Sequence, residues 1–167
     1  MRVLVVDDDR LVCESLKTIL QAHGDVEVVG TGYSGHEAVA LYAKLKPDVL
    51  LMDIRMEGMT GLEACRQVLS QFPDARVLFL TTFLDDEYIV QALRLGAKGY
   101  ILKQDFESII PALKAVHTGQ SVFGDAIVTK LPKLLQGIQS DEGDEKAIAA
   151  RLSAHGIKDR ERDIIEL

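Results

Sequence analysis

Residues Pro47 to Gly61 read PDVLLMDIRMEGMTG, and this stretch decides the fold. Val49 to Met52 form a continuous apolar run, a pattern typical of a strand that is covered on both faces of a sheet. A single carboxylate, Asp53, follows at the carboxyl end of the run, and a loop with two glycines comes next. Ligands of open parallel sheets bind beyond the carboxyl ends of the strands. Asp53 therefore stands where chemistry is expected, although taken alone it fits a turn-forming residue equally well.

Short apolar runs like this one recur along the chain, with amphipathic segments between them. The runs predict strands at residues 2–6, 26–29, 49–52, 76–80 and 99–102. The intervening segments predict helices that begin near residues 10, 35, 61, 86 and 105. Strands and helices that alternate at this spacing imply right-handed crossovers and a parallel sheet with helices on both faces. We therefore expect an α/β, flavodoxin-like doubly wound (βα)5 fold with strand order 2-1-3-4-5, followed by a helical linker.

The expected strand order brings acidic side chains together. Strand one is followed by Asp7 and Asp8, and it lies beside strand three, which is followed by Asp53. Three carboxylates in one crevice repel one another, and a divalent cation removes that cost. Carboxylate, carbonyl and water oxygens are the ligands that suit Mg²⁺. The sequence thus predicts a magnesium site beyond the carboxyl ends of strands one and three.

Two further polar side chains follow neighbouring strands at the same edge of the sheet. Thr81 brings a hydroxyl donor after strand four, and Lys103 brings a charge suited to a phosphoryl oxygen after strand five. Each has an ordinary explanation on its own, as a strand-end threonine or a surface lysine, and Tyr100 alone fits a core aromatic. Their convergence with the acids predicts a phosphoryl-transfer site with a carboxylate nucleophile.

Composition narrows the possible classes of function. The formal charge of −7 argues against a nucleic-acid-binding surface in these 167 residues. No apolar run is long enough to span a bilayer, and the start, MRVLVVDDD, does not fit a signal peptide. Cys13 and Cys65 lack metal-binding spacing and are expected to be buried thiols in a reducing compartment. These features predict a cytoplasmic protein with no membrane partner.

The residues of the predicted site resemble those of a known family. The resemblance covers about the first 120 residues and rests on Asp7-Asp8 after VLVV, Asp53 in LLMDIRM, Thr81 in LFLTT, and Tyr100 with Lys103 in GAKGYILK. These motifs resemble the receiver domain of bacterial two-component response regulators. The phrases LTTFLDDEYIVQALRLGAKGYILK and DRERDIIEL further resemble the NarL/FixJ subfamily, whose output domain is a LuxR-type helix-turn-helix.

The resemblance implies that Asp53 accepts a phosphoryl group from a sensor histidine kinase. The chain would then be a phosphoacceptor with self-catalysed phosphorylation and dephosphorylation, not a conventional enzyme. Asp8 and Asp53 would ligate Mg²⁺ directly, Asp7 would act through water, and the carbonyl of Arg55 would complete the protein contacts. Mn²⁺ is expected to be tolerated at the same site.

The resemblance also implies a switch around the phosphoryl group. Lys103 would pair with it, Thr81 and the adjacent Thr82 would bind it, and Tyr100 would turn inward to fill the space that Thr81 vacates. Two large residues, Arg55 and Phe83, fall at positions that influence dephosphorylation in the family. Both are large enough to obstruct an attacking water, so we expect a relatively long-lived aspartyl phosphate.

The resemblance divides the chain into three parts. Residues 1–120 would form the receiver, residues 121–150 a helical and acidic linker, and residues 151–167 the truncated start of a helix-turn-helix domain. A weak helical pattern runs from residue 122 to residue 135 within the linker. The recognition helix would lie beyond Leu167, so no DNA-binding residue is expected in this fragment. The full-length protein would form a homodimer, bind promoter DNA through the missing output domain and control transcription.

Two other functions fit part of the sequence. A haloacid-dehalogenase-type phosphatase uses a DxDx(T/V) pattern after its first strand, and Asp7 to Leu11 supply both aspartates but not the final Thr or Val. Such an enzyme would use Asp7 as its nucleophile. The second alternative is a stand-alone receiver that acts on a protein partner. The tail at residues 159–167 argues against this alternative.

Overall fold

The computed structural model describes residues 1–82 and 85–123. Its strands are β1 (Arg2–Val6), β2 (Glu27–Gly32), β3 (Val49–Met52), β4 (Val77–Thr81), β5 (Gly99–Leu102) and β6 (Val122–Phe123). Its helices are α1 (Arg10–Gln21), α2 (Gly35–Leu45), α3 (Gly61–Gln71), α4 (Asp86–Leu95) and α5 (Ile109–His117), with a 3₁₀ turn, η1 (Phe106–Ser108), before α5. Strands and helices alternate as the sequence predicts.

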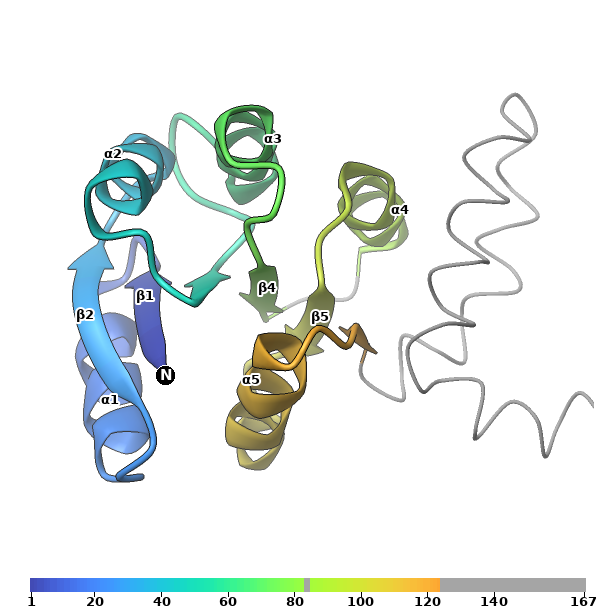
Figure 1. Cartoon of the computed structure of the whole chain (residues 1–167). Helices are drawn as coiled ribbons and strands as arrows, with labels where there is room; N and C mark the ends of the chain where they lie inside the picture. The colour runs from blue at the N-terminus through green and yellow to red at the C-terminus, as the bar shows by residue number, and fades with distance from the viewer. Residues whose placement is uncertain (83–84, 124–167) are drawn as a thin grey trace, which may run out of the picture.

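All strand pairs are parallel, and the sheet has the order β2-β1-β3-β4-β5-β6. The first five strands confirm the predicted order 2-1-3-4-5. Figure 1 shows α1 and α5 on one face of the sheet and α2, α3 and α4 on the other. Each face has its own buried cluster, and both contain alternate residues of the central strands, such as Leu50 on one face and Leu51 on the other.

Local sequence sets where the helices begin. The hydroxyls of Ser34 and Thr60 and the carboxylate of Asp85 each accept backbone N–H bonds at the starts of α2, α3 and α4. Thr60 and Glu63 form a complete capping box at α3. At α2, Glu37 also lies three residues after the capping serine, but its carboxylate accepts the N–H of Tyr33, the residue before Ser34. These caps fix the loops that hold the site.

Two strands differ from the sequence prediction. β2 runs to Gly32 and not to residue 29, because it pairs with β1 as far as Val6. Asp7 then donates its N–H to the carbonyl of Gly32 at 3.1 Å, which continues the pairing. The weak helical pattern predicted from residue 122 is wrong for Val122 and Phe123, which form β6. Residues 124–135 lie outside the described residues.

Candidate functional site

The acidic side chains of the site come from the ends of β1 and β3. The N–H of Asp53 donates to the carbonyl of Val6 at 3.0 Å, which holds the end of β3 against the end of β1. One carboxylate oxygen each from Asp7, Asp8 and Asp53 lies within 4.8 Å of the others. Asp7 and Asp53 are buried, whereas Asp8 is exposed. The strand order therefore brings together the three acids as the sequence predicts.

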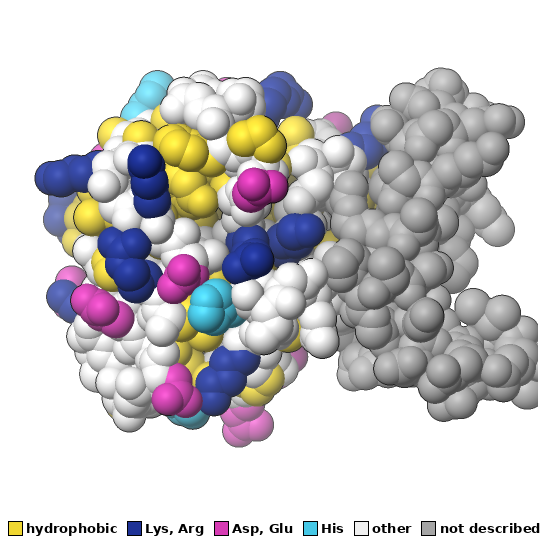
Figure 2. Space-filling view, viewed as in Figure 1, with side chains coloured by type: hydrophobic (Ala, Val, Ile, Leu, Met, Phe, Trp, Pro, Cys, Tyr) yellow, Lys and Arg dark blue, Asp and Glu magenta, His cyan; other side chains and the backbone are white. Residues whose placement is uncertain are grey.

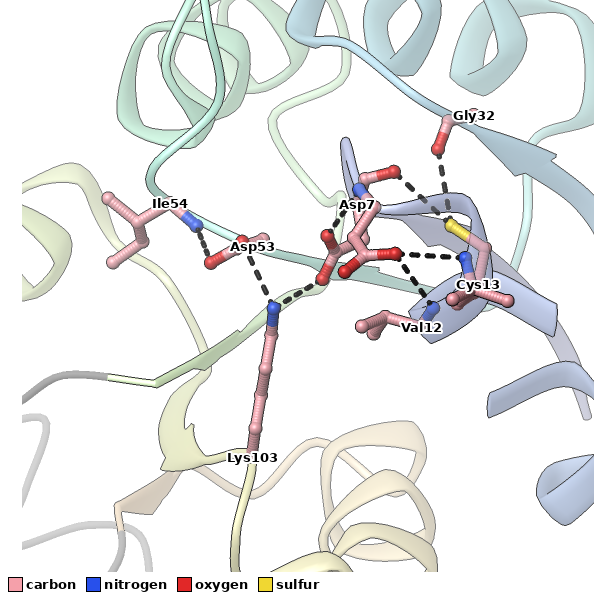
Figure 3. A network of polar contacts seen from close by, with 9 residues as sticks. Asp7, Val12, Cys13, Gly32, Asp53, Ile54 and Lys103 are labelled. Carbon is pink, nitrogen blue, oxygen red and sulfur yellow. Dashed lines mark hydrogen bonds and ion pairs between the residues drawn. The ribbon is translucent and has the colours of Figure 1, made fainter. Parts of the chain in front are cut away.

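Lys103 reaches into the same crevice from β5. Its N–H donates to the carbonyl of Thr81 at 2.7 Å, which continues the β4–β5 pairing past the strand ends. Its Nζ lies 3.1 Å from Oδ2 of Asp53 and 2.5 Å from Oδ2 of Asp7. Figure 3 shows the lysine side chain extended between the two carboxylates. The lysine thus bridges the acids of two strands with one cation.

Burial is the largest influence on the pKa of Asp53. Burial raises the pKa of its carboxyl group above the ordinary value, and the charge of Asp7 adds to this, while Lys103 acts in the opposite direction. Its Oδ1 accepts the N–H of Ile54 at 2.8 Å, which also favours the charged form. Asp53 is consequently a desolvated carboxylate held in one orientation by two donors.

Lys103 remains a cation in this setting. Burial lowers the pKa of its ammonium group, but the hydrogen bond that it donates to Asp7 and the charges of Asp53 and Asp7 outweigh burial and leave the pKa raised. Three carboxylates face this single ammonium group, so the crevice keeps an excess of negative charge. That excess, with oxygen donors within 4.8 Å and one exposed acid, fits a hard divalent cation that retains waters.

The structure describes four of the remaining predicted residues, on β4, on β5 and on the segments that follow β3 and β4. Thr81 is buried at the end of β4, and Thr82 is exposed directly after it. Tyr100 is fully buried on β5, where its ring packs edge-on against Phe79 with centroids 6.5 Å apart. The side chain of Arg55 is exposed on the loop after β3. Phe83 lies outside the described residues.

The third acid after β1 has a different role from its neighbours. Asp9 caps α1, and its carboxylate accepts the N–H groups of Leu11 at 2.9 Å and Val12 at 3.4 Å. The N–H of Asp9 in turn donates to Oδ1 of Asp7 at 2.9 Å. The run of three aspartates therefore divides into two site residues and one helix cap.

Two residues that shape the site, Ile54 and Gly61, are not among those predicted from the sequence. The backbone N–H of Ile54 orients Asp53, and backbone contacts of this kind are independent of the side chain. The main chain of Gly61 lies against Asp53 so closely that a Cβ there would overlap its carbonyl oxygen. A glycine as the first residue of a helix, after a capping threonine, is the signal that indicates such a close approach.

The two cysteines are buried thiols, as predicted. Burial and the charge of Asp7 raise the pKa of Cys13 to about 11, and burial raises that of Cys65 to about 12. Sγ of Cys13 donates to the carbonyl of Asp7 at 3.3 Å, so this thiol supports the site backbone (Figure 3). Both shifts disfavour the thiolate, which is the form in which a cysteine acts as a nucleophile.

A family model and several sequence relatives match this chain, and they agree on one protein family. The model of the response regulator receiver domain matches residues 3–114. The response regulator protein VraR of Staphylococcus aureus is 40% identical over 132 residues, which cover 78% of this chain and 63% of VraR. The transcriptional regulatory protein DegU of Brevibacillus brevis is 33% identical over 174 residues, which cover 100% of this chain and 74% of DegU. The chain thus spans about two thirds of the length of these relatives.

Solved structures agree with the sequence relatives. A two-component response regulator of the LuxR family from Aurantimonas sp. SI85-9A1 superposes with a TM-score of 0.76 at 26% identity, covering 83% of this chain and 98% of that one. The receiver domain of the putative response regulator NarL from Mycobacterium tuberculosis gives a TM-score of 0.68 at 35% identity, covering 71% of this chain and 97% of that one. The described fold and the family model therefore point to the same class of protein.

Proposed function

The chain belongs to the response regulator receiver family, and from this premise we propose that Asp53 accepts the phosphoryl group of a two-component phosphorelay. The observation that carries the proposal is the bridge of Lys103 between Asp53 and Asp7 in one buried crevice. A buried carboxylate next to a fixed cation and further acids is the arrangement that phosphoryl transfer to an aspartate requires. Family membership argues against the phosphatase alternative, which would use Asp7 as the nucleophile.

The acids of the crevice would hold Mg²⁺. In this proposal Asp8 and Asp53 ligate the ion directly, Asp7 acts through water, and the Arg55 carbonyl completes the protein contacts, with Mn²⁺ tolerated. When bound, the ion supplies positive charge that offsets repulsion between the carboxylates and an incoming phosphoryl group. The close approach of the three carboxylates and the exposure of Asp8 support this assignment.

The residues of this chain position the reacting oxygen. Lys103 and the N–H of Ile54 hold the two oxygens of Asp53, so the carboxylate faces the crevice without rotating. A carboxylate oxygen of Asp53 attacks phosphorus, the bond from phosphorus to the donor nitrogen breaks, and the histidine nitrogen of the kinase keeps the electron pair. Lys103 then neutralises the phosphoryl oxygens, and Thr81 and Thr82 donate hydroxyl hydrogen bonds to them.

The partners follow from the family and from the relatives. The phosphoryl donor is a sensor histidine kinase, and the site of action is the cytoplasm. Among residues 1–82 and 85–123, no helix is long and apolar enough to cross a membrane. The relative DegU, a transcriptional regulator, matches the whole of this chain. We therefore assign residues 151–167 to the start of a DNA-binding output domain, residues 121–150 to a linker, and homodimerisation to the full-length protein.

An apolar surface beside the site supports a protein as the phosphoryl donor. A hollow between α1 and the sheet is lined by Leu11, Val12, Ser15, Leu16, Ile19, Leu80 and Lys103. Leu11 is 78% exposed and Ile19 44% exposed, and both are large hydrophobic residues. Because Lys103 borders this hollow and also contacts Asp53, a partner that covers α1 would place its donor group at the crevice.

The proposal is tested with acetyl phosphate, a small phosphoryl donor, in Mg²⁺ buffer and in EDTA. Intact-protein mass spectrometry is expected to show at most one phosphoryl group per chain, dependent on Mg²⁺ and absent from Asp53→Asn. Asp9→Asn keeps a capping side chain on α1 and serves as the matched control, which should be labelled normally. Multiple turnover of a phosphomonoester that depends on Asp7 would instead support the phosphatase alternative.

The lifetime of the aspartyl phosphate is part of the same proposal. Arg55 and Phe83 are assigned to obstruct the water that would hydrolyse it, and the exposed position of the Arg55 side chain beside Asp53 supports this for Arg55. The label should persist well beyond seconds in Mg²⁺ buffer after the donor is removed, and Arg55→Ala should shorten its lifetime. Loss of the label within seconds in the unmodified protein would contradict the assignment.

A further inference from the structure

The last strand of the sheet lies against the proposed switch residue Tyr100. β6 follows α5 and pairs in parallel with β5, with Val122 opposite Gly99 and Phe123 opposite Tyr100. It is the short orange strand beside β5 in Figure 1. Residues opposite one another in neighbouring strands point to the same face of the sheet. Phe123 therefore shares a face with Tyr100.

Phe123 completes a row of large side chains that crosses the sheet. Met52 of β3 lies opposite Phe79, Phe79 opposite Tyr100, and Tyr100 opposite Phe123. All four are buried in the cluster beneath α2, α3 and α4. Met52 is the residue directly before Asp53. The row thus connects the strand that bears the phosphoacceptor to the strand with which the described chain ends.

The backbone of β6 is tightly seated on β5. The N–H of Val122 donates to the carbonyl of Lys98 at 2.7 Å. The two strands approach so closely at Gly99 that a Cβ there would overlap the carbonyl oxygen of Val122. Phe123 is 5% exposed and Ser121 3% exposed. A side chain larger than glycine at position 99 would keep β6 from this position.

Burial of β6 also carries a cost. Among the described residues, Oγ of Ser121 is a buried side-chain oxygen without a hydrogen-bond partner. A buried hydroxyl without a partner offsets part of the stability gained from burying Phe123. The stability gained from docking β6 is therefore smaller than the burial of Phe123 alone would give.

From this arrangement we propose that Phe123 is a positioning residue, which holds Tyr100 in its buried position and couples the docking of β6 to phosphorylation of Asp53. The inference rests on the proposed function, in which phosphorylation favours the inward position of Tyr100. Tyr100 is already buried here with β6 docked against it, so docking of β6 and burial of Tyr100 favour each other. Phosphorylation therefore favours docking of β6, and docking of β6 favours binding of the phosphoryl group by the same factor. Removal of Phe123 is expected to reduce this mutual gain.

The first test measures binding of beryllofluoride, a phosphoryl mimic, to the full chain in Mg²⁺ by calorimetry. Phe123→Ala is expected to weaken binding about five-fold or more, the lower end of the usual coupling between linked sites. Phe72→Ala is the matched control, because it removes an aromatic ring that packs against the same core away from β6. The ring of Phe72 lies beside that of Tyr42, with the centroids 5.2 Å apart. Equal affinity of Phe123→Ala and the unmodified protein would overturn the proposal.

The second test needs no variant. Hydrogen exchange of the Val122 N–H is measured by NMR with and without beryllofluoride and Mg²⁺, and exchange is expected to slow when the mimic binds. The N–H of Val26, which donates to His23 at 3.3 Å on the far side of the sheet, is the reference. Binding of the mimic with unchanged exchange at Val122 would overturn the coupling alone. Failure of the unmodified protein to bind the mimic would overturn the proposed function and this inference with it.

Discussion

Gly61 shows how one backbone position controls the geometry around Asp53, the proposed phosphoacceptor. Its N–H donates to the carbonyl of Ile54 at 2.8 Å, which closes the loop after β3. A Cβ on Gly61 would overlap the carbonyl oxygen of Asp53 and lie 2.9 Å from Cα of Ile54. Both contacts are with main-chain atoms, which cannot rotate away as a flexible side chain could. Any larger residue would therefore displace the segment that carries Asp53.

Replacement of Gly61 tests this contact. Gly61→Ala is expected to destabilise the fold by roughly 1–3 kcal/mol, the usual cost of overpacking, and to slow labelling of Asp53 by acetyl phosphate. Gly30→Ala is the control, because its Cβ would meet side-chain ends and no main-chain atom: Cδ1 of Leu45 at 2.8 Å and Cδ1 of Leu4 at 3.5 Å. Urea denaturation and labelling rates are measured for both variants. Normal stability and labelling of Gly61→Ala would show that the backbone contact is unimportant.

The raised pKa of Asp53 predicts how stability depends on pH. The folded state holds this proton more tightly than the unfolded state, so its contribution to stability is fully present below the ordinary carboxyl pKa of about 4 and is lost as pH rises through the folded pKa. Asp53→Asn removes this loss. In EDTA, the free energy of unfolding of Asp53→Asn relative to the unmodified protein should therefore increase from acidic to neutral pH. A difference that stays constant or decreases with pH would contradict the sign of the shift.

Among the secondary-structure elements, the helices are best located from the sequence by their N-terminal capping residues. Ser34, Thr60 and Asp85 were each predictable as helix starts, because each precedes an amphipathic segment and offers a side-chain acceptor. The start of α5 was less predictable. The chain first forms the 3₁₀ turn η1 (Phe106–Ser108), and Ser108 makes no side-chain capping bond. Without a cap, pattern alone does not separate a 3₁₀ turn from the first turn of a helix.

The cap of α4 gives a prediction about stability. Asp85 accepts the N–H groups of Glu87 at 3.0 Å and Tyr88 at 3.3 Å. Asp85→Ala is expected to cost about 1 kcal/mol in the free energy of unfolding, whereas Asp85→Asn keeps the acceptor and should cost much less. Urea denaturation of the two variants distinguishes the cap from the charge. Equal losses in both variants would indicate that the negative charge, and not the cap, stabilises α4.

Some strands are marked by an apolar run in the sequence, and others are not. The apolar runs predict β1, β3, β4 and β5 because these strands are buried on both faces. The end of β2 was missed because Gly30 to Gly32 carry no apolar pattern, and this segment pairs with β1 through backbone hydrogen bonds. β6 was missed because Val122 and Phe123 are too short a run, and only the close approach of Gly99 explains their pairing.

At the scale of the whole molecule, the topology assembles the site. No single segment contains it, yet strand order alone is enough to place Asp7, Asp8, Asp53 and Lys103 at one edge of the sheet. The bridge from Lys103 to both Asp7 and Asp53 was not predictable, because it depends on the path of a long side chain and on burial. On the face seen in Figure 2, Lys and Arg side chains are interspersed with Asp and Glu and with apolar patches. That face of the described chain offers no continuous basic surface for a nucleic acid.

Binding of Mg²⁺ should stabilise the whole fold through the acidic crevice. A ligand that binds only the folded state adds about 2.7 kcal/mol when its concentration is one hundred times its dissociation constant. Thermal denaturation should therefore show a higher Tm with increasing Mg²⁺, and Asp8→Asn should largely abolish the increase. Asp9→Asn should retain it, because Asp9 is occupied as the cap of α1. A similar Mg²⁺ response in Asp8→Asn would place the ion elsewhere.

In the proposed function Asp53, and no other carboxylate of the crevice, receives the phosphoryl group. The most direct test is to phosphorylate the chain with acetyl phosphate and Mg²⁺, reduce the aspartyl phosphate with borohydride, and map the modified residue by peptide mass spectrometry. If Asp53 is the acceptor, homoserine appears at position 53 and the aspartates at positions 7 and 8 stay unmodified. Homoserine at position 7, or none at position 53 in a chain that carries the label, would contradict it.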